Sequence, residues 1–229
     1  MPGQPAAPLL ATLVLVGGVV FGLACEAEQA PWPRVRGQQG NAALPPGVSL
    51  PAGLTCSESL QMPPAHTLLV CRQGTDAHPE LGLFAVDGQK VKPVARWQGA
   101  YVAHLSGFAA AARADGCGRA GKAACAVQLV DLSDETCMGT LVFWADAAGA
   151  WHKAGLIREV QVKGGETACL ADSAEVQPQA DSLVLRFHGE VARPTADGLF
   201  KAVVGGPLRY RLEANGSLRA QSAVAQSPR

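Results

Sequence analysis

The sequence predicts an all-β protein, an antiparallel sandwich or barrel of about ten strands with one short helix, stapled by disulfides. Three observations lead to this prediction. Segments in which apolar and polar residues alternate recur along the chain. Turn dipeptides such as Asp87-Gly88 and Asn215-Gly216 separate several of them. The chain also contains seven cysteines. We expect a single domain over residues 56–219 and a disordered tail over residues 220–229.

The strands are placed by their alternation and by the turns between them. Residues 183–188 show the cleanest alternation, and Asp87-Gly88 predicts a hairpin. Pro93 has no amide hydrogen, which places its strand at a sheet edge or at a bulge. The predicted strands cover 67–71, 81–86, 89–97, 100–105, 126–132, 141–144, 151–162, 183–188, 198–204, 208–213 and 217–220.

The short helix is predicted over residues 108–114. This segment is rich in alanine, and Ser106 is a suitable N-cap. Three hairpins share a glycine-centred turn, at Gly88, Gly149 and Gly216. A small propeller is therefore an alternative to the sandwich, although these turns are too unevenly spaced for regular blades.

Residues 1–24 are predicted to be a signal peptide. From Ala6 to Ala24 there is no charged residue, and the stretch is strongly apolar. It is also nearly long enough to span a bilayer, so an uncleaved anchor is the alternative. No lysine or arginine precedes the apolar run, which is unusual for a signal peptide, whereas Arg34 and Arg36 follow it.

The end of this segment favours lipidation. Gly22-Leu23-Ala24-Cys25 resembles the lipobox of bacterial lipoproteins, although Gly22 stands where that pattern prefers leucine. The resemblance implies that Cys25 carries lipid and becomes the new N-terminus, and Glu26 is compatible with sorting to the outer membrane. We therefore expect a periplasmic or surface-exposed protein that is anchored in the cell envelope through its N-terminal lipid.

The cysteine count agrees with this expectation. An odd number in an exported protein requires an explanation, and lipid on Cys25 leaves six that can pair completely. Their spacing does not match a metal site. The simplest of the fifteen possible connectivities joins sequence neighbours, which gives Cys56–Cys71, Cys117–Cys125 and Cys137–Cys169.

The segment from Asp115 to Cys125, DGCGRAGKAAC, superficially matches two nucleotide motifs. It is one residue short of a phosphate-binding P-loop, and Gly116 to Gly121 spell G-x-G-x-x-G. Both motifs require a strand before the glycines and a helix after them, whereas here the predicted order is reversed. We interpret the segment as a glycine-rich loop closed by Cys117 and Cys125, and we expect no nucleotide and no other cofactor.

Composition limits the class of partner. Lysine plus arginine and aspartate plus glutamate number 19 each, so the formal net charge is +0, and no basic patch suggests nucleic-acid binding. Residues 25–55 are rich in proline and lack a hydrophobic period. They predict a flexible tether after the lipidated cysteine, with an r.m.s. reach of roughly 30 Å.

Catalytic and metal motifs are missing from the sequence. There is no G-x-S-x-G or H-E-x-x-H, and the five histidines are scattered, which predicts no metal site. The acidic cluster Asp131, Asp134 and Glu135 is interpreted as a solvated turn rather than a cation site. The chain is more consistent with a binding protein than with an enzyme.

The sequence therefore predicts a non-enzymatic binding or structural β-domain of the bacterial envelope. Its partner would be an envelope protein or a glycan, and an inhibitor of a foreign hydrolase is a special case. Recognition would use hairpin tips, at 87–88, 146–150 and 215–216, with Trp151 as the aromatic contact and Trp144 in the core. The alternative is a secreted hydrolase whose site is assembled from dispersed residues.

Overall fold

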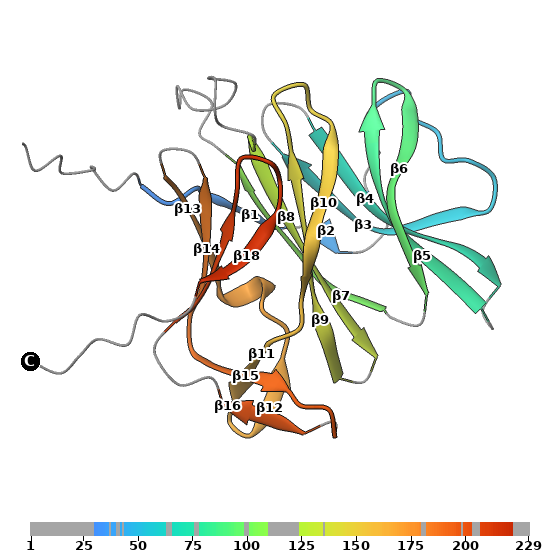
Figure 1. Cartoon of the computed structure of the whole chain (residues 1–229). Coiled ribbons are helices and arrows are strands. Elements are labelled where there is room, and N and C mark those ends of the chain that lie inside the picture. Colours follow the sequence, from blue (N-terminus) through green and yellow to red (C-terminus); the bar gives the residue numbers. More distant parts are fainter. Residues whose placement is uncertain are drawn as a thin grey trace, which may run out of the picture.

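The computed structural model is nearly all β, which confirms the predicted fold class (Figure 1). Its strands form four antiparallel sheets, and their number, eighteen in the described part, exceeds the expected ten. The structure describes residues 30–36, 38–39, 42, 44–62, 66–75, 78–98, 101–109, 124–134, 136–179, 182–197, 199–202 and 207–221.

Two five-stranded sheets form the larger part of the molecule. Each consists of a four-stranded meander with a short N-terminal strand added at one edge. The N-terminal sheet has the order β2 (Gln38–Gln39), β3 (Leu54–Met62), β4 (His66–Thr75), β5 (His78–Asp87) and β6 (Lys90–Gln98). The central sheet has the order β1 (Arg34–Arg36), β7 (Tyr101–Ala109), β8 (Ala126–Asp134), β9 (Thr136–Ala145) and β10 (Trp151–Ile157).

Two four-stranded sheets are formed by the C-terminal part of the chain (Figure 1). The C-terminal sheet has the order β13 (Ala174–Pro178), β14 (Leu183–Phe187), β17 (Leu208–Leu212) and β18 (Leu218–Gln221). The small sheet has the order β12 (Glu166–Ala168), β11 (Val160–Lys163), β15 (Glu190–Pro194) and β16 (Phe200–Ala202). A single 3₁₀ turn, η1 (Ala171–Ser173), leads into β13.

The central sheet is buried on both faces. Along β8, Ala126 and Val130 pack in the cluster beneath the N-terminal sheet, whereas Val127 and Leu129 pack in the cluster beneath the C-terminal sheet. Because both faces of the sheet are covered, the sequence of β8 is a nearly continuous run of apolar residues and does not strictly alternate between apolar and polar residues. The central sheet thus serves as the shared layer of two packed cores.

The N-terminal part of the described chain runs along the edges of three sheets. We call residues 30–36 and 38–39 the N-terminal strap. Its Trp32 amide donates to the Val176 carbonyl on β13 at 2.8 Å. Arg34–Arg36 pair with β7, and Gln38–Gln39 pair with β3. The strap therefore covers open edges that would otherwise expose unpaired backbone groups.

This finding corrects the expectation of a flexible tether over residues 25–55. Described residues of this segment contact the domain from Trp32 onward, and Leu44 and Leu50 pack against the outer face of the N-terminal sheet. The segment lacks a hydrophobic period because the strap is held mainly through backbone hydrogen bonds, and its two packed apolar side chains, Trp32 and Val35, contact different cores. Cys25 lies outside the described residues.

The disulfides support the layered arrangement. Cys56 and Cys71 are directly opposite each other on β3 and β4, and Cys137 on β9 is joined to Cys169, just before η1. Both are pairs of sequence neighbours, as predicted. Cys125 is also disulfide-bonded, while its predicted partner Cys117 lies outside the described residues, as does most of the glycine-rich loop.

Two predictions about local structure are wrong. Ser106 and Phe108 belong to β7, so no helix begins there, and residues 110–114 lie outside the described part. The pairing of β7 with β8 and with the strap overrides the helical preference of alanine. The predicted strand over 151–162 is two strands, β10 and β11, which belong to different sheets.

The break between β10 and β11 is fixed by a buried carboxylate, Glu159. Arg193 Nη2 lies 2.7 Å from Glu159 Oε1, and the Tyr210 hydroxyl donates to Oε2 at 2.7 Å. Burial alone would raise the pKa of Glu159, but the hydrogen bonds from Tyr210 and Arg193 lower it overall. This contact joins the small sheet to the C-terminal sheet at the corner where the chain changes direction.

Other predictions are confirmed in detail. Asp87 and Lys90 pair across the predicted turn at Gly88, which has a positive φ of 60°. β6 is an edge strand, and a bulge separates the pairs Leu83↔Ala95 and Phe84↔Pro93. Pro93 thus lies at an edge and next to a bulge, where its missing amide is tolerated.

Candidate functional site

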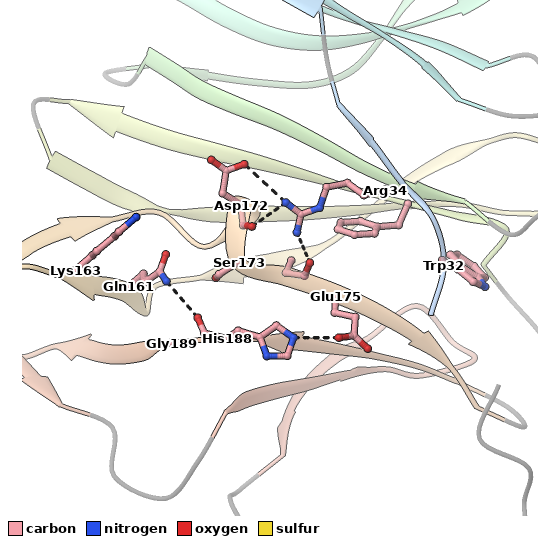
Figure 2. A pocket seen from close by; sticks show the side chains of 11 residues that line it. Trp32, Arg34, Gln161, Lys163, Asp172, Ser173, Glu175, His188 and Gly189 are labelled. Carbon is pink, nitrogen blue, oxygen red and sulfur yellow. Dashed lines mark hydrogen bonds and ion pairs between the residues drawn. The ribbon is translucent and has the colours of Figure 1, made fainter. Parts of the chain in front are cut away.

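An open groove of about 580 Å³ lies where the strap meets η1 and the strands on either side of it (Figure 2). It is lined by residues from the strap, β7, β11, η1, β13 and the β14–β15 turn. The lining residues are Trp32, Arg34, Phe108, Gln161, Lys163, Asp172, Ser173, Ala174, Glu175, His188 and Gly189. Because these residues are up to 157 positions apart in the sequence, only the packing of the sheets brings them together.

Arg34 forms the centre of one wall. Its Nη1 donates to the Asp172 carbonyl at 2.8 Å, and its Nη2 donates to the Ala174 carbonyl. The guanidinium lies over the Phe108 ring, 5.2 Å from the centroid, in cation–π geometry. Arg34 Nη1 is also 3.8 Å from Asp172 Oδ1. The arginine therefore fastens the strap to η1 and β13 and shapes the groove at the same time.

The η1 turn beside Arg34 is fixed from behind by a buried carboxylate. Asp131 on β8 is fully buried and accepts hydrogen bonds from the Thr140 hydroxyl at 2.5 Å and from the Ala171 amide at 3.2 Å. Since η1 carries Asp172 and Ser173, Asp131 determines where these two residues lie. Asp131 is thus a structural residue in the core and not part of a solvated turn, which corrects that expectation.

A histidine–carboxylate pair lies on the outer side of the groove. His188 Nε2 is 3.0 Å from Glu175 Oε2, and the His188 side chain is 60% exposed. A carboxylate only accepts hydrogen bonds, so Nε2 is the donor in this pair, and Nδ1 is an acceptor when the ring carries a single proton. Gly189 follows with a φ of +94°, and a Cβ there would be 2.6 Å from Gln161 Nε2. Glycine is therefore required for the close approach of Gln161.

The backbone carbonyls around the groove already accept hydrogen bonds. Those of Asp172 and Ala174 accept from Arg34, that of Ser173 accepts from the His188 amide at 3.1 Å, and that of His188 accepts from Gln161 Nε2 at 3.3 Å. Side chains therefore supply most of the donors and acceptors that remain for a ligand. Lys163 Nζ, Gln161 Oε1 and His188 Nδ1 have no hydrogen-bond partner within the part of the chain that the structure describes.

The fixed charges of the groove are balanced. Arg34 and Lys163 are positive, and Asp172 and Glu175 are negative. Apart from His188, two cations face two anions, so these four charges cancel. Such a site offers no strong attraction for a highly charged ligand.

The residues predicted for recognition lie elsewhere. Trp151 packs against the core between the N-terminal and central sheets, and its indole nitrogen is buried. Trp144 packs against the other core and stacks on His152, with centroids 4.4 Å apart. The tip at 215–216 lies against Trp144 near the end of β9, since a Cβ on Gly216 would lie 2.6 Å from the Trp144 ring. The structure does not bring Trp151 into the groove.

Sequence reasoning missed the groove because its two most important residues lie in the proline-rich segment. The sequence contains one indication of this site: an aromatic residue, Trp32, and a cation, Arg34, lie close together in a segment that is otherwise predicted to be a flexible tether. His188 and Glu175 face each other across the register of β13 and β14, where Ala174 pairs with Phe187. This pairing cannot be read from the sequence without the strand β13, which was not predicted.

Two classes of site are absent from the described residues. No group of three or more histidine, cysteine, aspartate or glutamate side chains is arranged to hold a metal ion there. Within the same ranges, we find no helix with the length and hydrophobicity needed to cross a membrane. The apolar segment over residues 6–24 lies outside them.

Comparisons with known proteins identify no relative. No protein-family model, no curated protein and no solved structure matches this chain.

Proposed function

We propose that this protein is a non-enzymatic binding module of the bacterial cell envelope, anchored in the membrane through Cys25, and that its ligand occupies the groove. The observation that carries the proposal is the construction of the groove. Exposed polar side chains converge on it from the small sheet, η1, β13 and the β14–β15 turn. Their positions are held by Arg34, Asp131 and the Gln161 hydrogen bond, so the site is formed before a ligand arrives.

The compartment and the anchor rest on the N-terminal sequence and on the cysteines. Disulfides are typical of proteins that fold in an oxidising environment, which supports export. The lipobox-like sequence before Cys25 supports attachment to a membrane. Since an outer-membrane lipoprotein meets other envelope components continuously, a binding function fits this placement.

A secreted hydrolase is the second candidate, because Ser173, His188 and Glu175 line the same groove. Against it, the Ser173 hydroxyl donates to the Leu170 carbonyl at 3.0 Å, and no hydrogen bond joins the Ser173 hydroxyl to the His188 ring in the described structure. A nucleophilic serine requires a base within hydrogen-bond reach. The geometry therefore favours binding over catalysis.

The experiment is a retention assay with the membrane-extracted protein in detergent. The protein is immobilised and incubated with an envelope extract, and the bound material is eluted and quantified. We expect Lys163→Ala to reduce retention, because Lys163 lines the groove. The matched control is Lys153→Ala, an exposed strand lysine on β10 outside the groove.

Two results would contradict the proposal. Equal retention by wild type and Lys163→Ala would place the binding surface elsewhere. Turnover of the bound material by wild type, but not by Ser173→Ala, would establish the hydrolase instead.

A further inference from the structure

We propose that the ligand of the groove is an uncharged saccharide chain; this inference rests on the proposed binding function. The groove differs from the usual small-molecule pocket, which is enclosed and mostly apolar. It is open, seven of its eleven lining residues carry polar side chains, and its accessible surface is about equally polar and apolar. An open and rigid surface of this mixed kind suits a ligand that has both polar groups and apolar faces and extends beyond the site.

The charge balance excludes strongly charged ligands. A phosphate-rich or polyanionic ligand would meet Asp172 and Glu175, and a polycation would meet Arg34 and Lys163. Ionised groups left unpaired at such a site cost binding free energy. The ligand with the best match is therefore polar and has no net charge.

The hydrogen-bonding pattern favours hydroxyl groups over a peptide backbone. An extended peptide binds by adding a strand, which needs free backbone donors and acceptors along a sheet edge. Beside the groove, the edge of β13 already receives the Trp32 amide at Val176 and the Arg34 guanidinium at Ala174. The available groups are side chains that accept, such as Gln161 and His188, together with one donor, Lys163. Hydroxyls both donate and accept, so they can satisfy this mixed set.

Trp32, the aromatic residue at one end of the groove, also favours a saccharide ligand. Trp32 and Lys163 lie at opposite ends of the set of lining residues (Figure 2). An indole ring offers a flat apolar face next to a polar site, and the C–H face of a pyranose ring is flat and apolar as well. A chain of sugar rings could stack one unit on Trp32 while the hydroxyls of the next units contact Glu175, His188 and Gln161.

The test uses chemical treatment of the envelope extract before the retention assay. Sodium periodate cleaves vicinal diols and so destroys most saccharides, whereas proteinase K removes proteins and peptides. We expect periodate to abolish retention by the wild-type protein and proteinase K to leave it unchanged. Lys163→Ala and Gln161→Ala should each lower the retained amount by about tenfold, which corresponds to the loss of one good hydrogen bond to a charged or buried group. Lys153→Ala should retain as much as wild type.

Two parallel assays determine whether the saccharide is recognised alone or as the headgroup of a glycolipid. Water-soluble oligosaccharide released by mild acid, and the same extract reconstituted in vesicles, are assayed side by side. Retention of the soluble material supports recognition of the saccharide alone, and retention of the vesicles only supports recognition of a glycolipid headgroup. Retention that survives periodate but is lost with proteinase K would overturn the saccharide inference and leave the binding function intact. Equal retention by wild type and Lys163→Ala would overturn both.

Discussion

Glu58 is a buried carboxyl group in the seam between the N-terminal and central sheets. It is 6% exposed, and burial raises its pKa to about 7, although a hydrogen bond from the Leu105 backbone partly opposes this shift. No cation lies beside it among the described residues. The carboxyl is therefore accommodated in its neutral form, next to Leu60 and Met62 of the same strand.

This raised pKa predicts a loss of stability with rising pH. The contribution of Glu58 is fully present below its unfolded pKa of about 4.5 and is lost as the pH rises through about 7. We expect the free energy of unfolding to fall by about 2 kcal/mol between pH 5 and pH 8.5, less than the full shift implies because the group keeps some contact with solvent. Urea titrations at the two pH values measure this change.

The control for this prediction is a pair of variants. Glu58→Gln should remove most of the pH dependence, whereas Glu166→Gln, exposed on β12, should retain it. The same pH dependence in wild type and Glu58→Gln would show that another group is responsible.

Two turn glycines give a matched test of packing. Gly216 and Gly88 both have positive φ, at 80° and 60°, so alanine is strained at either position. A Cβ on Gly216 would also lie 2.6 Å from Trp144 Cζ2, whereas one on Gly88 meets no atom within 4 Å. We expect Gly88→Ala to cost about 1 kcal/mol and Gly216→Ala about 3 kcal/mol, because only the latter displaces Trp144. Thermal unfolding with tryptophan fluorescence measures both, and equal costs would argue against close packing of Gly216 on Trp144.

At the scale of elements, the two described disulfides act differently. Cys56–Cys71 joins strands that are already paired, with a sequence separation of 15, whereas Cys137–Cys169 ties β9 to the approach of η1 across a separation of 32. In the chain-entropy model, loops of these sizes contribute about 3 and about 4 kcal/mol.

We therefore expect Cys137→Ala/Cys169→Ala to be more destabilised than Cys56→Ala/Cys71→Ala. Because η1 carries Asp172 and Ser173, the first variant should also weaken retention in the groove assay, while the second should not. Chemical denaturation and the retention assay measure the two effects. The reverse order of stability would mean that strain or residual structure outweighs loop length.

The strap is the element on which the groove depends most. We expect Arg34→Ala to increase amide hydrogen exchange over residues 30–36 and at η1, because the arginine donates to two carbonyls there. The core strand β8 should keep its protection. Hydrogen exchange followed by mass spectrometry measures this, and unchanged exchange at residues 30–36 would show that backbone pairing with β7 alone holds the strap.

The elements also show what can be predicted from sequence. Residues 183–187 alternate cleanly and form β14, and the turn at Asp87-Gly88 is where its dipeptide places it. The prediction that a helix begins near Ser106 was wrong because strand pairing on both sides of β7, up to Ala109, outweighs local preference. The strap has no periodicity to detect, and Trp32, Arg34 and His188 meet only through a topology that local patterns do not encode.

At the scale of the whole molecule, the N-terminal anchor is the main open prediction. We expect wild-type protein to partition into the detergent phase of a Triton X-114 extraction. Cys25→Ser should remain unprocessed or enter the aqueous phase, because the proposed lipid would be attached through the Cys25 sulfur. Mass spectrometry of the mature N-terminus identifies the modification. Mature wild-type protein that is cleaved elsewhere and found in the aqueous phase would contradict the lipoprotein assignment.

Because the strap is bound to the domain, the distance between the domain and a lipid on Cys25 is short, and this distance affects how the domain encounters a ligand. Trp32 is already hydrogen-bonded to Val176, so only seven residue steps separate it from Cys25, and an extended chain of that length spans at most about 25 Å. If Cys25 is lipidated, the domain is held close to the bilayer surface, and Trp32 brings one end of the groove within a short distance of it. The search for a ligand then takes place by lateral diffusion in two dimensions. A weakly binding groove can be well occupied under these conditions, because a membrane-bound ligand is present at a high effective concentration.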